Sequence, residues 1–250
     1  MTLRQKRITK KVMIYIVLVI MTIASLFPIF FCLSASLRTQ EDLFRNMFPF
    51  TIKSLIPTNI TWENYRIIFT KYEFWRPIMN TMLVTVFSII LGCLINSMAG
   101  FAFTCFEFKG KKFFYPLVLI SFMVPFEAIA IPLYNVANGL GMVDTYAGMI
   151  PAIADGLVTF LFIQFFKDIP PSLVEAARVD GAKWPTIFVK VIIPISIPVF
   201  VTAGLMIFMN QWNSYMWPLL VARSKEIRTI QIAISQFSGE SSIHIFTLVH

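Results

Sequence analysis

Five long apolar segments constrain the fold of this 250-residue chain more than any other feature of its sequence. They cover residues at about 12–35, 78–104, 113–136, 147–166 and 191–210. A membrane-spanning helix needs about 20 predominantly apolar residues, so each segment is long enough to cross a bilayer. Only 14% of the residues are charged, whereas soluble domains carry about 25%. We therefore expect an all-α fold, a polytopic bundle of membrane helices that forms a single transmembrane domain over residues 1–250.

A further apolar stretch begins at about residue 243. At 1.5 Å per residue, the stretch that follows is too short to cross roughly 30 Å of hydrocarbon. We expect five spans plus the start of a sixth helix, which this chain does not complete.

Basic residues flank the apolar segments in short tracts, as the positive-inside rule describes for cytoplasmic loops. They precede the first span or lie in one short loop: Arg4, Lys6, Arg7, Lys10, Lys11, Lys109, Lys111 and Lys112. Because these charges do not form one face or stripe, the formal charge of +8 does not indicate nucleic-acid binding. We expect the N-terminus to be cytoplasmic. Residues 105–112 and 167–190 would then be cytoplasmic, and residues 36–77, 137–146 and 211–242 external.

The sequence lacks the residues that an enzyme or a metal centre would need. Its two histidines, His244 and His250, both lie near the C-terminus, and its three cysteines show no paired spacing. No stretch matches the G-x-x-x-x-G-K-[ST] loop that binds nucleotide phosphates. We therefore expect a non-catalytic membrane subunit that itself binds no cofactor and no metal.

One polar segment, residues 168–190, separates the fourth and fifth apolar segments. Ser172 and Glu175 fit the capping-box pattern at a helix start, and Gly181 stands where a left-handed residue would end that helix. Pro185 suits the first turn of the next helix. The pattern predicts a helix of roughly nine residues, a tight turn and a second helix that leads into the fifth span.

The alanines of this segment, Ala176, Ala177 and Ala182, would give the short helix a nearly flat surface, which another protein's backbone can approach closely. Capping, turning and helix propensity explain each residue singly. They do not explain why a membrane bundle would place such a helix between two spans. We interpret the segment as a contact surface for a soluble cytoplasmic partner.

The same residues resemble a motif of the permease subunits of binding-protein-dependent ABC importers. That motif reads EAA, three residues, G, nine residues and I-x-L-P. Here the matching positions hold Glu175-Ala176-Ala177, Gly181 and Val191-Ile192-Ile193-Pro194. Further positions are similar to the carbohydrate-uptake class and its second-permease (maltose G-type) subfamily: Asp180, Ala182, Phe188, Pro198 and the stretches 124–134 and 210–219.

This resemblance implies a type I ABC importer fold and ATP-driven uptake of a sugar, most of all an oligosaccharide. It implies that the chain couples to its ATPase through Glu175, Ala176, Ala177, Asp180 and Gly181. The implied partners are a second homologous permease, two cytoplasmic ATPase subunits that bind ATP and Mg²⁺, and an extracellular solute-binding protein. The implied location is the bacterial cytoplasmic membrane, in contact with its lipids.

Two other functions stay open on the sequence. One is an ABC permease for a non-sugar solute, such as a peptide or a polyamine. The other is a self-contained secondary transporter, which predicts inverted repeats or a relay of charged residues within the spans. Neither of these two features is evident in the sequence.

Polar residues within or beside the spans are candidates for the substrate pathway. They are Glu127, Asn80, Asn210, Trp212 and Asn213. Glu127 lies between Pro125 and Pro132, where a broken helix would line a cavity; the alternative is a structural carboxylate that pairs with a neighbouring chain. Trp212 and Asn213, together with Tyr215 and Trp217, suit stacking and hydrogen bonding to a sugar. Their position just outside the fifth span favours an interfacial aromatic belt or an external gate over sugar binding.

Overall fold

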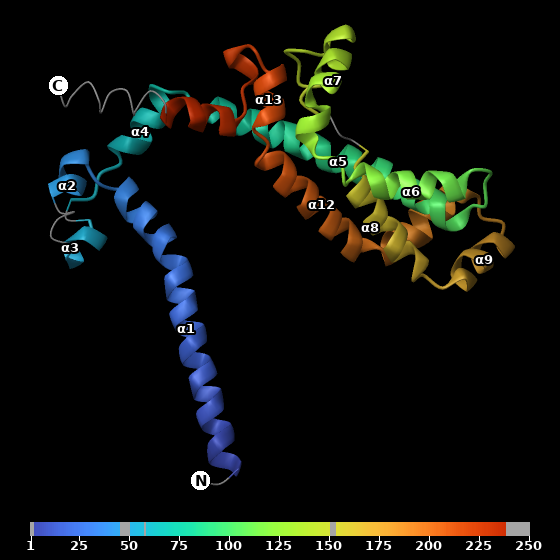
Figure 1. Cartoon of the computed structure of the whole chain (residues 1–250), viewed down its shortest axis with the longest axis horizontal. Coiled ribbons are helices and arrows are strands. Elements are labelled where there is room, and N and C mark those ends of the chain that lie inside the picture. Colours follow the sequence, from blue (N-terminus) through green and yellow to red (C-terminus); the bar gives the residue numbers. More distant parts are fainter. Residues whose placement is uncertain (1–2, 46–50, 58, 151–153, 239–250) are drawn as a thin grey trace. The chain divides into compact units, whose positions relative to one another are not determined.

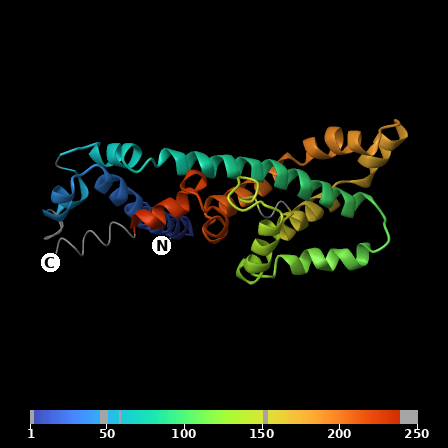
Figure 2. The same cartoon turned by 90° about the horizontal axis from the view of Figure 1, so that it is seen from above.

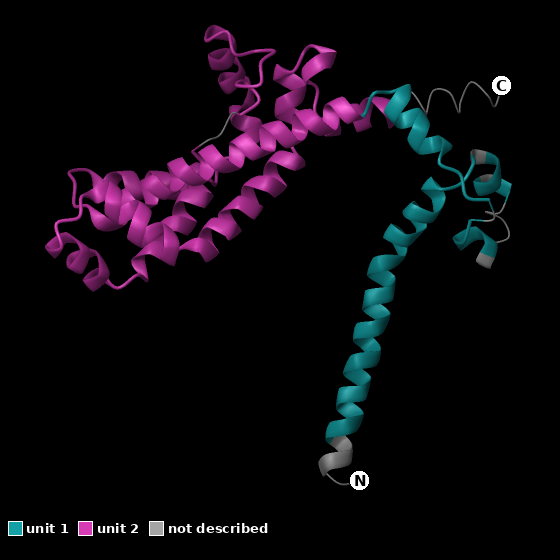
Figure 3. Ribbon diagram, turned by 180° about the vertical axis from the view of Figure 1, so that it is seen from behind, with its two compact units in different colours: residues 1–74 teal, residues 75–250 magenta. Residues whose placement is uncertain are grey.

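The computed structural model describes residues 3–45, 51–57, 59–150 and 154–238. Within these ranges the regular structure is helical and contains no strand (Figure 1). The expected start of a sixth span, at about residue 243, lies outside the described residues. The chain divides into two units, residues 1–74 and residues 75–250 (Figure 3).

The first unit consists of one long helix and three short ones. Beyond its basic first turns helix α1 (Leu3–Ser36) is apolar, and the apolar window of its span-like part, Arg7–Ser36, has no buried residue. An apolar helix of this length whose surface is exposed along most of it is typical of a membrane span. The short helices that follow are α2 (Gln40–Arg45), α3 (Ile52–Leu55) and α4 (Glu63–Thr70). The Asn64 side chain fixes α4 to the end of α1 by donating hydrogen bonds to the carbonyls of Ser36 and Arg38, at 2.9 and 2.7 Å.

Helix α5 (Trp75–Cys105) is the central element of the second unit, and it packs against α8 and α12 (Figures 1 and 2). Its buried face carries small and polar residues, including Thr85, Ser88, Asn96, Ser97 and Gly100. Small residues allow membrane helices to approach closely. At Gly100 an added Cβ would lie only 2.7 Å from the Cβ of Phe162 on α8, so glycine is required for this contact.

The remaining long apolar segments are broken helices. Helices α6 (Lys111–Ser121) and α7 (Phe126–Gly139) meet at 107°, because Pro125 adopts an extended conformation between them. Helices α8 (Gly156–Lys167) and α9 (Pro171–Val179) meet at 76°. Two described helices are each long and apolar enough to cross a membrane, and up to five spans result if each bent pair is one span. The third expected segment, 113–136, is thus helical on both sides of a bend.

The fourth expected segment, 147–166, differs from the structure at its start. Residues 141–150 form turns, and the helix begins only at Gly156. Asp155 caps this helix, since its side chain accepts hydrogen bonds from the backbone N–H groups of Leu157 and Val158. Hydropathy does not register such a cap, because it averages over the segment.

The fifth apolar segment begins with a widened helix. Short helix α10 (Trp184–Ile187) continues through the π-helical turn η1 (Phe188–Ile192) and α11 (Ile193–Ile195). It then bends by 82° into α12 (Ile197–Trp212). Pro194 and Pro198 lack the N–H groups that would bond to the carbonyls four residues earlier, which weakens the helix on both sides of the bend.

Two apolar clusters hold the second unit together. The cluster beneath α9 and α10 includes Phe101, Phe162, Phe166, Ile187, Phe188 and Ile192. The other includes Val84, Met149, Trp217, Val221 and Ile232, and it involves α13 (Met216–Val221). The short 3₁₀ helix η2 (Lys225–Ile227) and a helical segment over 230–238 complete the described chain.

Candidate functional site

Helix α9 (Pro171–Val179) lies within the segment for which a partner contact is expected, and its length of nine residues agrees with the prediction. Its start differs from the prediction. Pro170 occupies the N-cap position, Pro171 is the first helical residue, and no side chain caps the helix. The expected capping box of Ser172 and Glu175 is therefore wrong, because the fixed φ of Pro171 starts the helix before Ser172. Glu175 is left without a capping role.

The end of α9 is a tight turn of the kind that the sequence predicts. Gly181 has φ of 80°, in the left-handed region. The N–H of Gly181 donates to the carbonyl of Arg178, and the N–H of Ala182 donates to the carbonyl of Ala177, each at 3.0 Å. This pair of bonds is a Schellman motif, which satisfies the last carbonyls of the helix. Pro185 lies in the first turn of α10, as expected.

The inner side of α9 packs on the apolar cluster beneath it. Val174, Ala177 and Ala182 contact this cluster. Trp184 lies with its ring centroid 4.6 Å from that of Phe106, and the Arg178 guanidinium stands 4.8 Å above the Trp184 ring. Apolar contact, a cation–π contact and a hydrogen-bonded turn thus fix the helix to the end of the bundle.

Four of the five predicted coupling residues are exposed, on α9 or in the turn that ends it. Glu175, Ala176, Asp180 and Gly181 are exposed, whereas Ala177 is half-buried against the apolar cluster. Val179 is 87% exposed, an unusual position for a β-branched apolar side chain in a short charged helix. The surface is therefore flat, partly apolar and open to a partner.

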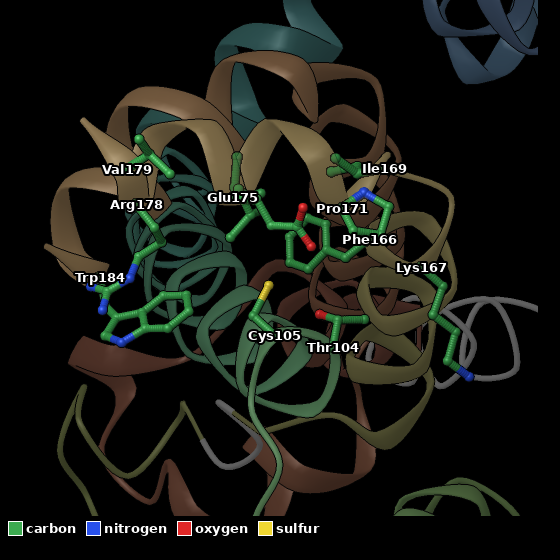
Figure 4. A pocket seen from close by; sticks show the side chains of 12 residues that line it. Thr104, Cys105, Phe166, Lys167, Ile169, Pro171, Glu175, Arg178, Val179 and Trp184 are labelled. Carbon is green, nitrogen blue, oxygen red and sulfur yellow. The ribbon is translucent and has the colours of Figure 1, made fainter. Parts of the chain in front are cut away.

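A cavity of about 620 Å³ lies between α9 and the ends of α5 and α8 (Figure 4). Glu175 extends from α9 into this cavity, and its carboxylate forms no ion pair or hydrogen bond within the described part of the chain. Thr104 and Cys105 line the side that α5 supplies. The walls are largely apolar, so the carboxylate is the main acceptor group that the cavity offers.

The substrate-pathway candidate Asn80 is occupied by contacts within the chain. Its side chain is buried and donates to the carbonyls of Glu226 and Arg228, at 2.8 and 2.9 Å. Its oxygen accepts a hydrogen bond from Tyr146 Oη at 2.8 Å. Asn80 therefore joins three segments that are distant in sequence, and its amide groups have protein partners.

The other four candidates lie on two separate elements, α7 and the end of α12. Glu127 is exposed in the first turn of α7, directly after the bend. Asn210, Trp212 and Asn213 lie at the end of α12; Asn210 and Asn213 are exposed and Trp212 is half-buried.

Two of these side chains have local contacts. Trp212 stacks on Phe208, with ring centroids 5.5 Å apart, and Asn213 Nδ2 donates to the carbonyl of Met209 at 2.8 Å.

The aromatic stretch after α12 has a buried member that sequence reasoning placed differently. Trp217 suggested either stacking on a sugar or a position in an interfacial belt. Instead it is buried, and its Nε1 donates to the carbonyl of Gly148 at 2.8 Å. Its ring also meets Phe126 edge to face, with centroids 6.1 Å apart. No local signal separates Trp217 from its exposed neighbours, because its partners come from distant parts of the chain.

The Asp144 carboxylate, in the turn after α7, connects two distant loops by hydrogen bonds. Asp144 accepts hydrogen bonds from the backbone N–H groups of Ser224 and Arg223, at 2.8 and 2.9 Å. These bonds, that of Ser224 first, hold the pKa of the Asp144 carboxyl below its usual value. These hydrogen bonds join residues 141–150 to the segment after α13.

The sequence profile of one protein family matches residues 88–249, which include α9 and the candidates other than Asn80. The family is described as "Binding-protein-dependent transport system inner membrane component". The structure resembles one of a bacterial ABC transporter involved in the import of the acidic polysaccharide alginate, with a TM-score of 0.82 and 24% identity. That match covers 94% of this chain and 82% of the other, and it supports the fold.

Three curated relatives are similar over most of their length. The arabinooligosaccharides transport system permease protein AraQ of Halalkalibacterium halodurans is 33% identical, over 84% of this chain and 75% of the relative. The sn-glycerol-3-phosphate transport system permease protein UgpE of Brucella abortus is 34% identical, over 88% and 79%. The lactose transport system permease protein LacG of Rhizobium radiobacter is 29% identical, over 91% and 81%.

Proposed function

The chain belongs to the family of binding-protein-dependent transport system inner membrane components, and from that membership we propose how it works within a transporter. Proteins of this family are transport permeases, so the chain is a membrane permease and not an enzyme. We propose that it is the transmembrane subunit of an ATP-driven sugar importer and forms half of the translocation pathway. A second homologous permease would form the other half.

The observation that carries this proposal is the placement of α9. The helix is fixed to the bundle on its inner side, and Ala176 on the helix and Asp180 and Gly181 in the turn after it are exposed. Glu175 is exposed as well, at the cavity between α9 and the bundle. A rigid helix with a flat outer face suits docking into a cleft of a cytoplasmic ATPase. Because its inner side packs on the cluster that joins α5, α8 and α12, a displacement of α9 would be passed to the spans.

Transport would then follow from rigid-body motion. Two ATPase subunits would bind ATP and Mg²⁺ and close on each other, and each would move the docked helix of one permease. The paired permeases would rock between inward-open and outward-open states, which is alternating access by rigid-body motion. In this scheme the present chain supplies the mechanical contact and the pathway, and it binds no cofactor.

Two pairs of contacts support the sidedness that we propose. Trp184 meets Phe106 across the two loops expected in the cytoplasm, and Asp144 bonds to Arg223 and Ser224 across the two loops expected outside. Loops assigned to one side thus contact each other. We propose a cytoplasmic N-terminus on the basis of the positive-inside rule.

We propose a sugar, first of all an oligosaccharide, as the substrate. The relatives named for arabinooligosaccharides and lactose support this class. The relatives named for sn-glycerol-3-phosphate make a phosphorylated polyol the second candidate. Glu127, Asn210, Trp212 and Asn213 remain our candidates for the pathway, whereas we assign Asn80 to the scaffold because its amide is fully engaged.

Crosslinking from an introduced cysteine with a short thiol- and amine-reactive reagent tests the docking of α9. The experiment replaces Cys32, Cys93 and Cys105 by serine and introduces Val179→Cys, at the most exposed apolar position of α9. The chain is co-expressed with its neighbouring permease and a candidate ATPase. The matched control is Leu140→Cys, a position 68% exposed at the end of α7.

We expect a crosslink between the Val179→Cys chain and the ATPase and none from the control. An assembled complex in which neither or both positions crosslink to the ATPase would overturn the docking of α9.

A further inference from the structure

A second cavity, of about 590 Å³, lies between the end of α5, the start of α6 and the end of α8. It adjoins the cavity beneath α9, because Lys167 lines both. It also includes the basic loop between α5 and α6. The cavity therefore lies where three apolar helices end, which is the level of the lipid headgroups when such helices cross a bilayer.

The charge of this second cavity is positive. Lys111, Lys112 and Lys167 line it together with Glu107, which leaves a net charge of +2. Glu107 forms an ion pair with Lys111, whose Nζ lies 2.8 Å from Glu107 Oε1. Lys112 has no ion pair or hydrogen bond from its side chain among the residues that the structure describes. The surplus charge thus belongs to Lys112 and Lys167.

One wall of the second cavity is aromatic. Phe103 meets Phe108 and Tyr115, with ring centroids 5.6 and 6.2 Å apart. Lys167 Nζ lies 4.8 Å above the Tyr115 ring and 3.4 Å from its hydroxyl. The Lys167 ammonium is therefore oriented beside a hydroxyl that is itself a hydrogen-bond donor.

An apolar stripe of α6 begins at the second cavity. Phe113, Leu117 and Ile120 are exposed, and their spacing of four and three residues places them on one face of the helix. Pro116, which lines the cavity, lies on the same face. A ligand with a charged head in the cavity and a long apolar tail along α6 would match both surfaces.

We propose that the second cavity binds an anionic phospholipid, with its phosphate between Lys112 and Lys167 and an acyl chain along Phe113, Leu117 and Ile120. Basic pockets between membrane helices are suited to anionic headgroups. The apolar stripe distinguishes a lipid from a free phosphate, which would not use it. This proposal depends on the membrane location of the chain and not on its transported solute.

Native mass spectrometry of the purified full chain tests the proposal. The protein is titrated with dioleoylphosphatidylglycerol and, in parallel, with dioleoylphosphatidylcholine, which has the same acyl chains and no net charge. The test variant is Lys112→Gln/Lys167→Gln. The control variant is Lys53→Gln/Lys71→Gln, which removes the same charge from two exposed lysines of the first unit.

We expect the chain to prefer phosphatidylglycerol and the test variant to bind it about 30-fold more weakly, since a juxtamembrane lysine contributes roughly fivefold in affinity. The control variant should bind as the unmodified chain does. Inorganic phosphate should not displace the lipid.

Equal binding of the two lipids, an equal loss in both variants, or displacement by inorganic phosphate would each overturn the proposal.

Discussion

At Gly181 the backbone adopts φ of 80°, and nothing lies within 4 Å of the position that a Cβ would take. Any penalty for a side chain there comes from the backbone alone. In this region an L-residue other than glycine costs roughly 1–2 kcal/mol, and asparagine tolerates it better than alanine does.

We predict that Gly181→Ala frays the end of α9 and lowers transport, whereas Gly181→Asn retains more of both. Hydrogen exchange of the Asp180–Ala182 amides should become about five- to tenfold faster in the alanine variant, which corresponds to roughly 1 kcal/mol. Exchange in Gly181→Ala that equals that of the unmodified protein would show that the turn does not depend on glycine.

Asn80 and Asn210 provide a matched pair of amides, one buried and one exposed. We predict that Asn80→Ala lowers the free energy of unfolding by about 2 kcal/mol or more, because partly buried carbonyls and a hydroxyl lose their partner. The KM for the transported solute should not change. Asn210→Ala should leave stability unchanged and, if Asn210 lies on the pathway, raise KM.

Thermal unfolding in detergent and uptake kinetics separate these outcomes. A raised KM with unchanged stability in Asn80→Ala would return Asn80 to the substrate pathway.

Individual residues differ in how far the sequence predicts their roles. The left-handed conformation of Gly181 follows from a local pattern, and the structure confirms it. The capping pattern predicts Ser172 as the N-cap, and this is wrong because Pro171 already starts the helix. The partners of Asn80 lie 146 and 148 residues away along the chain, so no local pattern could predict them.

Among the elements, α9 combines a fixed inner side with an exposed outer side. Its length and its turn were predictable from proline, glycine and alanine positions. The bends within the apolar segments were harder to predict, because hydropathy reports only that a segment is apolar. Pro125 marks the 107° bend between α6 and α7. The late start of α8, by contrast, depends on the cap at Asp155 and on Asn96 of α5, whose oxygen accepts from the Asp155 N–H at 2.9 Å.

The turn after α7 depends on the ionised form of Asp144. Since hydrogen bonds lower its pKa in the folded state, the carboxylate stabilises the fold above its unfolded pKa of about 4, and this contribution is lost as pH falls through the folded pKa. Asp144→Asn keeps an acceptor and tolerates the positive φ of 63°.

We predict that the unmodified protein melts at a higher temperature than Asp144→Asn between about pH 5 and 8, and that the difference shrinks below about pH 4. Thermal scans of both proteins at matched ionic strength measure this. A difference that does not change with pH would show that charge at Asp144 is not the cause.

At the scale of the whole molecule, the fold and family follow from the sequence, and the contacts between distant segments do not. Apolar segments predict a helical membrane protein, and the spacing from Glu175 to Pro194 identifies the family that the profile match supports. The clusters around Phe162 and Trp217 depend on which helices meet. The packing of these helices places α9 against the ends of α5 and α8. Through these contacts a movement of α9 would reach the spans in the proposed coupling.

ATP-driven uptake in proteoliposomes tests the central claim most directly. The chain is reconstituted with its partner permease, ATPase and binding protein, and radiolabelled oligosaccharide is offered on the binding-protein side. We predict uptake that requires ATP and is abolished by Glu175→Lys, with the variant present in the membrane at normal levels; Glu63→Lys, an exposed position of α4, should transport normally. Uptake by the chain alone without ATP, or uptake unaffected by Glu175→Lys, would contradict the account.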